Sequence, residues 1–182
     1  MISTLQKCLD LLVRSSLRER SLAYKITATV IGGSLFLVVI PFLLFLAADA
    51  LDRLMPPDGW KSLELIVSIA AIVLGIFFVA WSTLTLARIG RGTPVPFVPT
   101  QKLIVSGPYK FCRNPIQLGA MLYYFGLGTL FGSIKIGLLM LLFGFVIGTC
   151  YHKFVEEKEL LLRFGPEYEE YKARTPFLLP RM

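Results

Sequence analysis

The sequence predicts an all-α, polytopic integral membrane protein with about four transmembrane helices, a C-terminal helical hairpin and a cytoplasmic helical tail. Apolar residues make up 55% of the 182 residues and charged residues only 17%, whereas soluble domains carry about 25% charged residues. Several apolar segments are long enough to cross a bilayer, and basic residues gather beside them. The mean hydropathy of +0.67 agrees with this class and excludes a disordered chain.

The first half of the chain predicts an interfacial helix followed by two spans. Residues 1–25 place leucines at helical spacing between charges. This pattern favours an amphipathic helix at the cytoplasmic interface, or one packed on the protein's own cytosolic face. Residues 26–48 carry no charge and reach roughly 34 Å as a helix, enough for a bilayer core. Pro41 is expected to kink this span, and residues 63–87 form the second span.

The second half predicts a helical hairpin. Asn114-Pro115 joins a favoured N-cap to a favoured first helical residue, so we expect a third span over residues 116–131. Gly132-Ser133 makes a tight turn, and a fourth span returns over residues 134–151. The charge-rich tail is expected to continue as a helix, break at Gly165-Pro166 and form a second short helix.

The positions of the charges orient the chain. Residues 1–25 and 87–115 are basic, and an even number of spans places both segments and both termini on one side. The positive-inside rule makes that side the cytoplasm. We divide the chain into an interfacial helix (1–25), two spans (26–87) and a cofactor-binding core (88–182). Because the net charge of +7 sits beside the spans, we expect membrane lipids and no nucleic acid as partners.

Two other classes of site are excluded by the residue inventory. Cys8, Cys112 and Cys150 are widely spaced, and His152 is the single histidine. We therefore expect reduced, structural thiols and no metal site. No charged residue lies in the middle of a predicted span, which argues against a proton-coupled transporter.

Polar residues concentrate in two blocks that flank the hairpin, residues 106–119 and 156–171. Because the hairpin returns, both blocks end at the same membrane face, and residues 113–119 come near residues 152–157. There a helix start, an arginine and two adjacent glutamates meet. Such a set suits a ligand that carries a carboxylate, an ammonium group and hydroxyls.

These blocks resemble the C-terminal signature of the isoprenylcysteine carboxyl methyltransferase and phospholipid methyltransferase superfamily, in its bacterial-type form. The matching residues are, in order, Gly107-Pro108-Tyr109, Arg113-Asn114-Pro115, Gly119, Glu156-Glu157, Leu160, Phe164-Gly165, Tyr168 and Tyr171. The resemblance covers roughly residues 88–182, about half of the chain. It implies an integral membrane enzyme in the bacterial inner (plasma) membrane.

The resemblance also implies a cofactor and a site. The cofactor is S-adenosyl-L-methionine, and the substrate is a lipophilic small molecule or lipid that enters laterally from the bilayer. The implied cofactor-binding residues are Tyr109, Arg113, Asn114, Pro115, Gln117, Gly119, Glu156 and Glu157. We expect Arg113, Glu157 and His152 to act in catalysis, His152 by helping an amine or thiol acceptor to lose a proton.

Three positions depart from the family pattern and keep other hypotheses open. Gln117 stands where tyrosine is frequent, Asn114 where histidine is frequent, and Phe177 where a basic residue often follows the proline. Oxygen, nitrogen and sulfur acceptors all fit. One alternative is a membrane reductase that is related to sterol reductases and uses NADPH. Another is a non-catalytic membrane scaffold on a degenerate methyltransferase core, with Arg113 facing lipid phosphate and His152 a simple interfacial residue.

Overall fold

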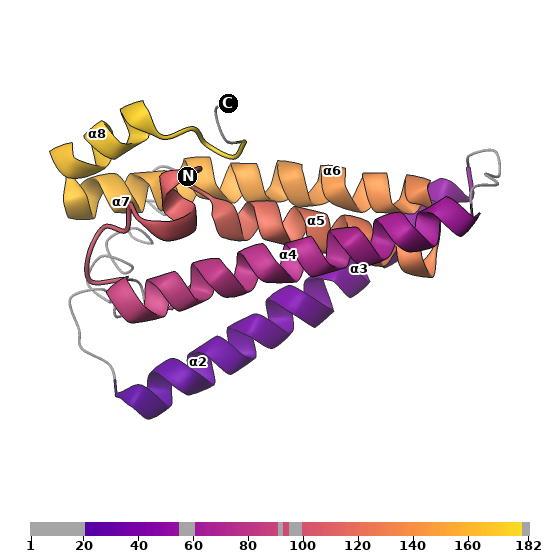
Figure 1. Ribbon diagram of the computed structural model, residues 1–182, viewed down its shortest axis with the longest axis horizontal. Coiled ribbons are helices and arrows are strands. Elements are labelled where there is room, and N and C mark those ends of the chain that lie inside the picture. The colour runs from indigo at the N-terminus through magenta and orange to yellow at the C-terminus, as the bar shows by residue number, and fades with distance from the viewer. Residues whose placement is uncertain (1–20, 55–60, 91–92, 95–99, 180–182) are drawn as a thin grey trace, which may run out of the picture. The chain divides into compact units, whose positions relative to one another are not determined.

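The computed structural model describes residues 21–54, 61–90, 93–94 and 100–179, and every regular element within these ranges is helical (Figure 1). The elements are α2 (Leu22–Ser34), the π turn η1 (Leu35–Val39), α3 (Ile40–Asp52), α4 (Lys61–Gly90), the 3-10 turn η2 (Gly107–Lys110), α5 (Pro115–Phe131), α6 (Ile134–Tyr151), the π turn η3 (His152–Glu156), α7 (Glu157–Phe164) and α8 (Pro166–Arg174). The predicted all-α class is confirmed. The interfacial helix expected over residues 1–25 lies almost wholly outside the described residues.

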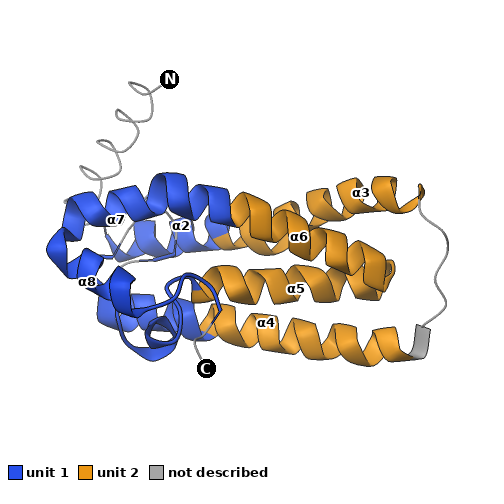
Figure 2. Cartoon of the chain, turned by 90° about the horizontal axis from the view of Figure 1, so that it is seen from above, with its two compact units in different colours: residues 1–32, 81–114, 149–182 blue, residues 33–80, 115–148 orange. Residues whose placement is uncertain are grey.

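The chain divides into two compact units, each built from segments that are distant in sequence (Figure 2). Unit 1 consists of residues 1–32, 81–114 and 149–182, and unit 2 of residues 33–80 and 115–148. The described part of unit 2 is helical apart from short turns. Unit 1 adds the loop before α5 and the C-terminal tail, so it contains most of both polar sequence blocks.

Pro41 interrupts the hydrogen bonding of the first long helix, where the sequence predicts a disturbance. Because proline has no N–H, the Leu37 carbonyl one turn earlier lacks its α-helical donor. The π turn η1 directly precedes Pro41, and there the Ile40 N–H donates to the Leu35 carbonyl. This bond leaves the Phe36 carbonyl without Ile40, its donor in a regular α-helix.

Two tyrosines of α5 donate to these two carbonyls. The Tyr123 hydroxyl lies 3.1 Å from the Leu37 carbonyl oxygen, and the Tyr124 hydroxyl lies 2.7 Å from that of Phe36. Inside a bilayer no water can replace such donors. The two hydroxyls therefore make the irregular turn tolerable and fix α5 against it.

Helix α5 also packs closely on α4 and on α6 within unit 2. A Cβ atom at Gly119 would lie 2.8 Å from the Gly75 carbonyl oxygen of α4, and one at Gly126 would lie 2.8 Å from that of Ser68. A Cβ atom at Gly137 of α6 would likewise lie 2.7 Å from a backbone oxygen of α5. Distances this short leave no room for a side chain, so glycine at these positions lets the helices approach closely.

The predicted hairpin of α5 and α6 is confirmed, with its turn at Gly132-Ser133. Side chains satisfy the first N–H groups of α6: Glu64 Oε1 accepts from the Ile134 N–H at 3.0 Å, and Ser133 Oγ accepts from the Ile136 N–H at 3.3 Å. The first N–H groups of a helix have no carbonyl acceptor within the helix, and these two side-chain oxygens take that place. Glu64 lies in the first turn of α4, and its side chain caps the start of α6.

Three continuous helices of the described chain are long and apolar enough to cross a membrane: Leu22–Asp52, Leu63–Gly90 and Ile134–Phe164. The third expected span, over residues 116–131, corresponds to α5, which has 17 residues. At about 1.5 Å per residue this falls short of a bilayer core of ~30 Å, because a proline begins the helix and a glycine turn ends it. In the last helix the charges gather after Tyr151, so we take residues 134–151 as its membrane-spanning part.

The tail breaks where the sequence predicts. Helix α7 ends at Phe164, and α8 begins at Pro166. Gly165 between them has a φ of +50°, a conformation that side chains with a Cβ rarely adopt. The proline then starts α8 without the loss of a helical hydrogen bond. The turn sets the direction of α8, whose residues contact the loop before α5.

We expect Tyr123→Phe to lower the free energy of unfolding by about 1–3 kcal/mol, because the Leu37 carbonyl loses its donor. Pro41→Ala restores an N–H one turn after that carbonyl. The cost of Tyr123→Phe should therefore be smaller in the Pro41→Ala background. Unfolding of the four proteins in one detergent measures this coupling. Equal costs in both backgrounds would contradict the assigned role of the hydroxyl.

Candidate active site

The loop before α5 docks on the C-terminal tail within unit 1. Gly107, with a φ of +61°, starts the 3-10 turn η2 of this loop. Hydrogen bonds join loop and tail, among them Arg113 N–H to the Pro176 carbonyl (2.9 Å), Asn114 Nδ2 to the Phe177 carbonyl (2.9 Å) and the Tyr171 hydroxyl to the Tyr109 carbonyl (2.7 Å). The two sequence blocks, which residues 120–155 separate, thus meet as predicted.

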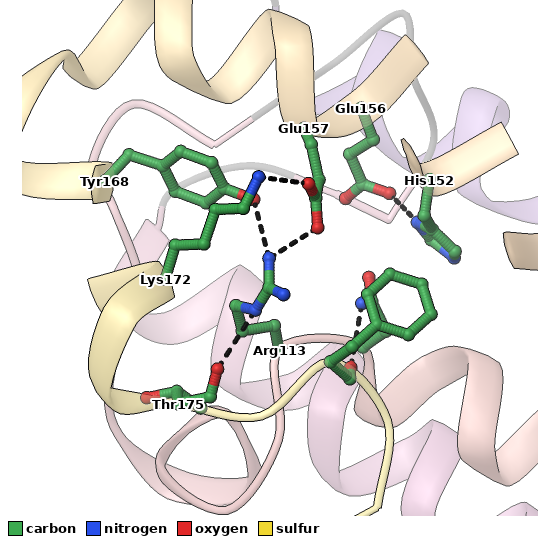
Figure 3. Close-up of polar contacts among 9 residues, drawn as sticks. Arg113, His152, Glu156, Glu157, Tyr168, Lys172 and Thr175 are labelled. Atoms are coloured by element: carbon green, nitrogen blue, oxygen red, sulfur yellow. Dashed lines mark hydrogen bonds and ion pairs between the residues drawn. The ribbon is translucent and has the colours of Figure 1, made fainter. Parts of the chain in front are cut away.

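Arg113 lies at the centre of a cluster of polar side chains (Figure 3). Its Nη1 donates to Glu157 Oε1 at 2.5 Å and to the Tyr168 hydroxyl at 3.4 Å. Its Nε donates to the Thr175 carbonyl at 3.1 Å, and its guanidinium carbon lies 5.5 Å from the centre of the Phe177 ring. Because these partners belong to α7, α8 and the segment after α8, one side chain connects the loop to the whole tail.

Glu157 lies between two cations. Its Oε1 accepts from Arg113, and its Oε2 accepts from Lys172 Nζ at 2.5 Å. The side chains of Arg113 and Glu157 are only 10% and 13% exposed. Burial raises the pKa of the Glu157 carboxyl, but the hydrogen bond from Lys172 and the charge and hydrogen bond of Arg113 outweigh burial and hold the pKa below its ordinary value. Glu157 is therefore a charged, fully paired carboxylate at neutral pH.

His152 and Glu156 form a second pair, at the two ends of the π turn η3. His152 Nδ1 contacts Glu156 Oε2. The imidazole also meets two aromatic rings edge-on, with centroid distances of 5.4 Å to Tyr151 and 6.4 Å to Phe177. The Glu156 side chain is 35% exposed, and its other oxygen lies on the side that faces Glu157 (Figure 3). Glu156 is thus the less enclosed of the two adjacent carboxylates.

A third ion pair holds the start of the loop. Arg163 Nη1 donates to Glu159 Oε1 at 2.7 Å on α7, and Arg163 Nη2 donates to the Thr100 carbonyl. The guanidinium carbon also lies 4.8 Å from the centre of the Phe164 ring. The Arg163 side chain is 8% exposed, so this contact is shielded from water. Arg163 thus holds the loop at Thr100, and Arg113 holds it just before α5.

The tyrosines of the cluster are protonated at neutral pH. Burial, with a smaller contribution from the Glu157 charge, raises the pKa of Tyr168 to about 12. Burial likewise raises the pKa of Tyr109 and of Tyr171. Their hydroxyls therefore remain hydrogen-bond donors, and the part of Tyr109 in cofactor binding stays a prediction.

The remaining predicted cofactor residues belong to unit 2. Pro115 begins α5 and is buried. Gln117 is buried as well, and its Nε2 donates to the Phe145 carbonyl at 3.4 Å. Gly119 packs on α4. Their neighbours in unit 2 account for their packing, and their part in cofactor binding stays a prediction.

Four tail residues that the sequence analysis did not assign complete the cluster: Lys172, Thr175, Phe177 and Arg163. The spacing of Tyr168 and Lys172 places both on one face of α8, and this signal was available in the sequence. Thr175 acts through its backbone carbonyl, which no residue pattern reveals. The sequence analysis treated Phe177 only as a lost basic residue, whereas its ring lies 5.5 Å from both the Arg113 and Lys153 cations.

The chemistry of these residues suits an organic ligand with charged and hydroxyl groups. Glu156 offers carboxylate oxygens to an ammonium group or to hydroxyls. The Phe177 ring lies beside two cations, Arg113 and Lys153, each 5.5 Å from its centre. Among the described residues, no three His, Cys, Asp or Glu side chains gather where they could hold a metal ion.

Fold and site together define a class: a helical membrane protein with a charged cluster where its last span leaves the membrane. The sequence model of one family, described as phospholipid methyltransferase, matches residues 63–167. The match covers more than half of the chain, so the chain belongs to the phospholipid methyltransferase family. The resemblance inferred from the two sequence blocks is thereby confirmed.

Two curated proteins are similar to this chain. The nickel-cobalt-cadmium resistance protein NccN of Alcaligenes xylosoxydans xylosoxydans is 30% identical over 120 residues, which cover 64% of this chain and 53% of NccN. The cobalt-zinc-cadmium resistance protein CzcN of Cupriavidus metallidurans is 32% identical over 106 residues, which cover 54% of this chain and 46% of CzcN. The chain thus spans about half the length of these relatives. No solved structure matches it.

We expect acid to weaken the contact between Glu157 and the loop. A carboxyl whose pKa is lowered on folding stabilises the folded state above its unfolded pKa, and this contribution disappears as the pH falls through the lowered value. Wild type should therefore unfold at a higher temperature than Glu157→Gln at neutral pH, and the difference should shrink as the pH falls below the ordinary value of 4.5.

Thermal unfolding of both proteins across the acidic range measures this difference. Glu170→Gln is the control, because Glu170 pairs with Arg174 on the surface of α8, where the two side chains are 67% and 72% exposed. Its difference from wild type should stay small throughout. A difference for Glu157→Gln that does not change with pH would show that the Glu157 charge contributes nothing.

Proposed function

We propose that this chain transfers a methyl group from S-adenosyl-L-methionine to a lipophilic small molecule or lipid at the cytoplasmic face of a bacterial inner membrane. Membership of the phospholipid methyltransferase family supports the reaction class. The observation that carries the proposal is the contact between the two sequence blocks through Arg113 and Glu157. A site made of both blocks needs this contact.

The residues of the cluster fit the cofactor. When bound, S-adenosyl-L-methionine supplies a methyl group that is already activated by its sulfonium centre. The protein then has to align the reactants and exclude water. We assign the ammonium group or the ribose hydroxyls to Glu156. Arg113 and Glu157, which pair with each other, act as positioning residues that hold the loop on the tail.

The substrate class follows from the membrane. The apolar helices and the family favour an acceptor that reaches the site from the bilayer, which makes membrane lipids the surroundings and a lipid or lipophilic molecule the substrate. The basic segments beside the spans favour the cytoplasmic face. Asn114, directly before α5, donates a hydrogen bond to the Phe177 carbonyl. This bond holds the segment after α8 beside the proposed site.

A role in metal resistance is a second candidate, favoured by the names of the two relatives. In this case the chain would contribute to metal resistance by methylating a membrane component, and it would not need to bind the metal itself. Loss of the gene should then lower the concentration of nickel, cobalt, zinc or cadmium that the host tolerates, and the wild-type gene should restore it. Tolerance that does not change would remove this candidate and leave the methyltransferase proposal intact.

Calorimetric titration of detergent-purified protein tests the cofactor assignment. We expect S-adenosyl-L-methionine and its demethylated product to bind, and NADPH not to bind. Glu156→Gln should weaken binding about tenfold or more, because a hydrogen bond between charged groups contributes about 1.5–3 kcal/mol. Glu170→Gln removes the same charge on α8 and should bind like wild type.

The labelled methyl group should also pass from the cofactor into a bacterial lipid extract. Folded wild-type protein that binds neither the cofactor nor its product would overturn the proposal. Binding of NADPH alone would favour the reductase hypothesis, and binding of none of the three ligands would favour the scaffold.

A further inference from the structure

The contact between His152 and Glu156 fixes one nitrogen of the imidazole. Glu156 Oε2 lies against Nδ1, and a carboxylate there favours the tautomer that carries its proton on Nδ1. In this tautomer the other nitrogen, Nε2, has a lone pair that can accept a proton. Figure 3 shows Nε2 on the side of the ring away from Glu156. A carboxylate that orients an imidazole in this way is a recurrent arrangement for a general base.

The pair also lies where a lipophilic acceptor would present its polar end. His152 directly follows the apolar span that ends at Tyr151, and the charged helix α7 begins at Glu157. Its side chain is 18% exposed, so access to the ring is restricted but not closed. The centre of its ring lies 6.4 Å from that of Phe177. His152 thus contacts Glu156, to which the cofactor is assigned above, and lies at the end of the last span.

We propose that His152 is the general base of the reaction and that the acceptor carries a proton on its attacking atom: a lipophilic thiol, amine or hydroxyl rather than a carboxylate. This inference rests on the proposed function. As the acceptor's heteroatom forms its bond to the methyl carbon, its proton passes to His152 Nε2. The bond between the methyl carbon and sulfur breaks, and its electron pair stays on sulfur as a neutral thioether. The Glu156 carboxylate stabilises the resulting imidazolium.

The choice of a protic acceptor follows from the site's charges. A carboxylate acceptor is already a nucleophile at neutral pH and needs no base, but it needs a cation to receive it. Arg113 is the most central cation of the cluster, and its guanidinium is engaged by Glu157 and by the Thr175 carbonyl. A thiol, amine or hydroxyl needs a base to take its proton and does not need a cation. The oriented imidazole of His152 supplies that base.

Methyl transfer to four acceptors with one chain length and different polar groups tests the substrate class: dodecanethiol, dodecylamine, dodecanol and dodecanoate. We expect labelled methyl groups on the thiol, the amine or the alcohol and none on the carboxylate. With saturating cofactor, His152→Gln should lower this rate by about 10²-fold or more, the usual contribution of a general base. Its Kd for S-adenosyl-L-methionine should equal that of wild type, and Glu170→Gln should keep the wild-type rate.

The imidazole itself supplies a readout that does not depend on activity. His152 is the single histidine of the sequence, so ¹⁵N-histidine labelling of protein without a histidine tag gives one pair of ring resonances. In the neutral imidazole we expect a proton on Nδ1 and none on Nε2. In Glu156→Gln the proton should shift toward Nε2, whereas in Glu170→Gln it should stay on Nδ1.

The two proposals fail in different ways. Folded wild-type protein that does not bind S-adenosyl-L-methionine removes the proposed function, and this inference with it. If the cofactor binds, four results overturn the inference alone: transfer only to dodecanoate, transfer to none of the acceptors, a wild-type rate in His152→Gln, or a proton on Nε2 in the wild-type protein.

Discussion

The ion pair of Arg113 and Glu157 is the interaction on which the rest of the site depends. It joins a loop and a tail that are separated in sequence by a complete helical hairpin, and both side chains are nearly buried. A buried charge without a partner is strongly unfavourable. Arg113 therefore holds the loop in one position only while Glu157, the Thr175 carbonyl and Tyr168 remain around it. Lys172 shares Glu157 and extends the same constraint to α8.

Unit 2 depends on a different constraint, the absence of water from the bilayer. Pro41 and the π turn before it leave two carbonyls without helical donors, and a membrane offers no solvent to replace them. The hydroxyls of Tyr123 and Tyr124 supply the donors from α5. Glycines let α5 approach its neighbours closely enough for such contacts. Polar bonds hold both units, but in unit 1 they join charged groups and in unit 2 they repair an irregular helix.

The sequence predicted those parts of the fold that follow from local rules. The start of α5 at Pro115, the turn at Gly132-Ser133 and the break at Gly165-Pro166 all lie where proline and glycine leave the chain little choice. The number of spans was harder to predict from the sequence. It depends on the length of each helix, and α5 ends after 17 residues. Of the site, the sequence predicted that Arg113 and Glu157 come together. It gave no indication that Arg163 holds Thr100, since the acceptor is a backbone carbonyl.

By itself, the sequence determined that this is a helical membrane protein of the phospholipid methyltransferase type, because composition, hydropathy and ordered motifs are properties of the chain that need no partner. Only the tertiary structure decided which groups neutralise one another. Glu156 and Glu157 are adjacent and chemically identical, yet Glu157 is enclosed by two cations while Glu156 contacts His152. The physical reason is that successive helical residues point in different directions, so their environments depend on what the fold packs against each side.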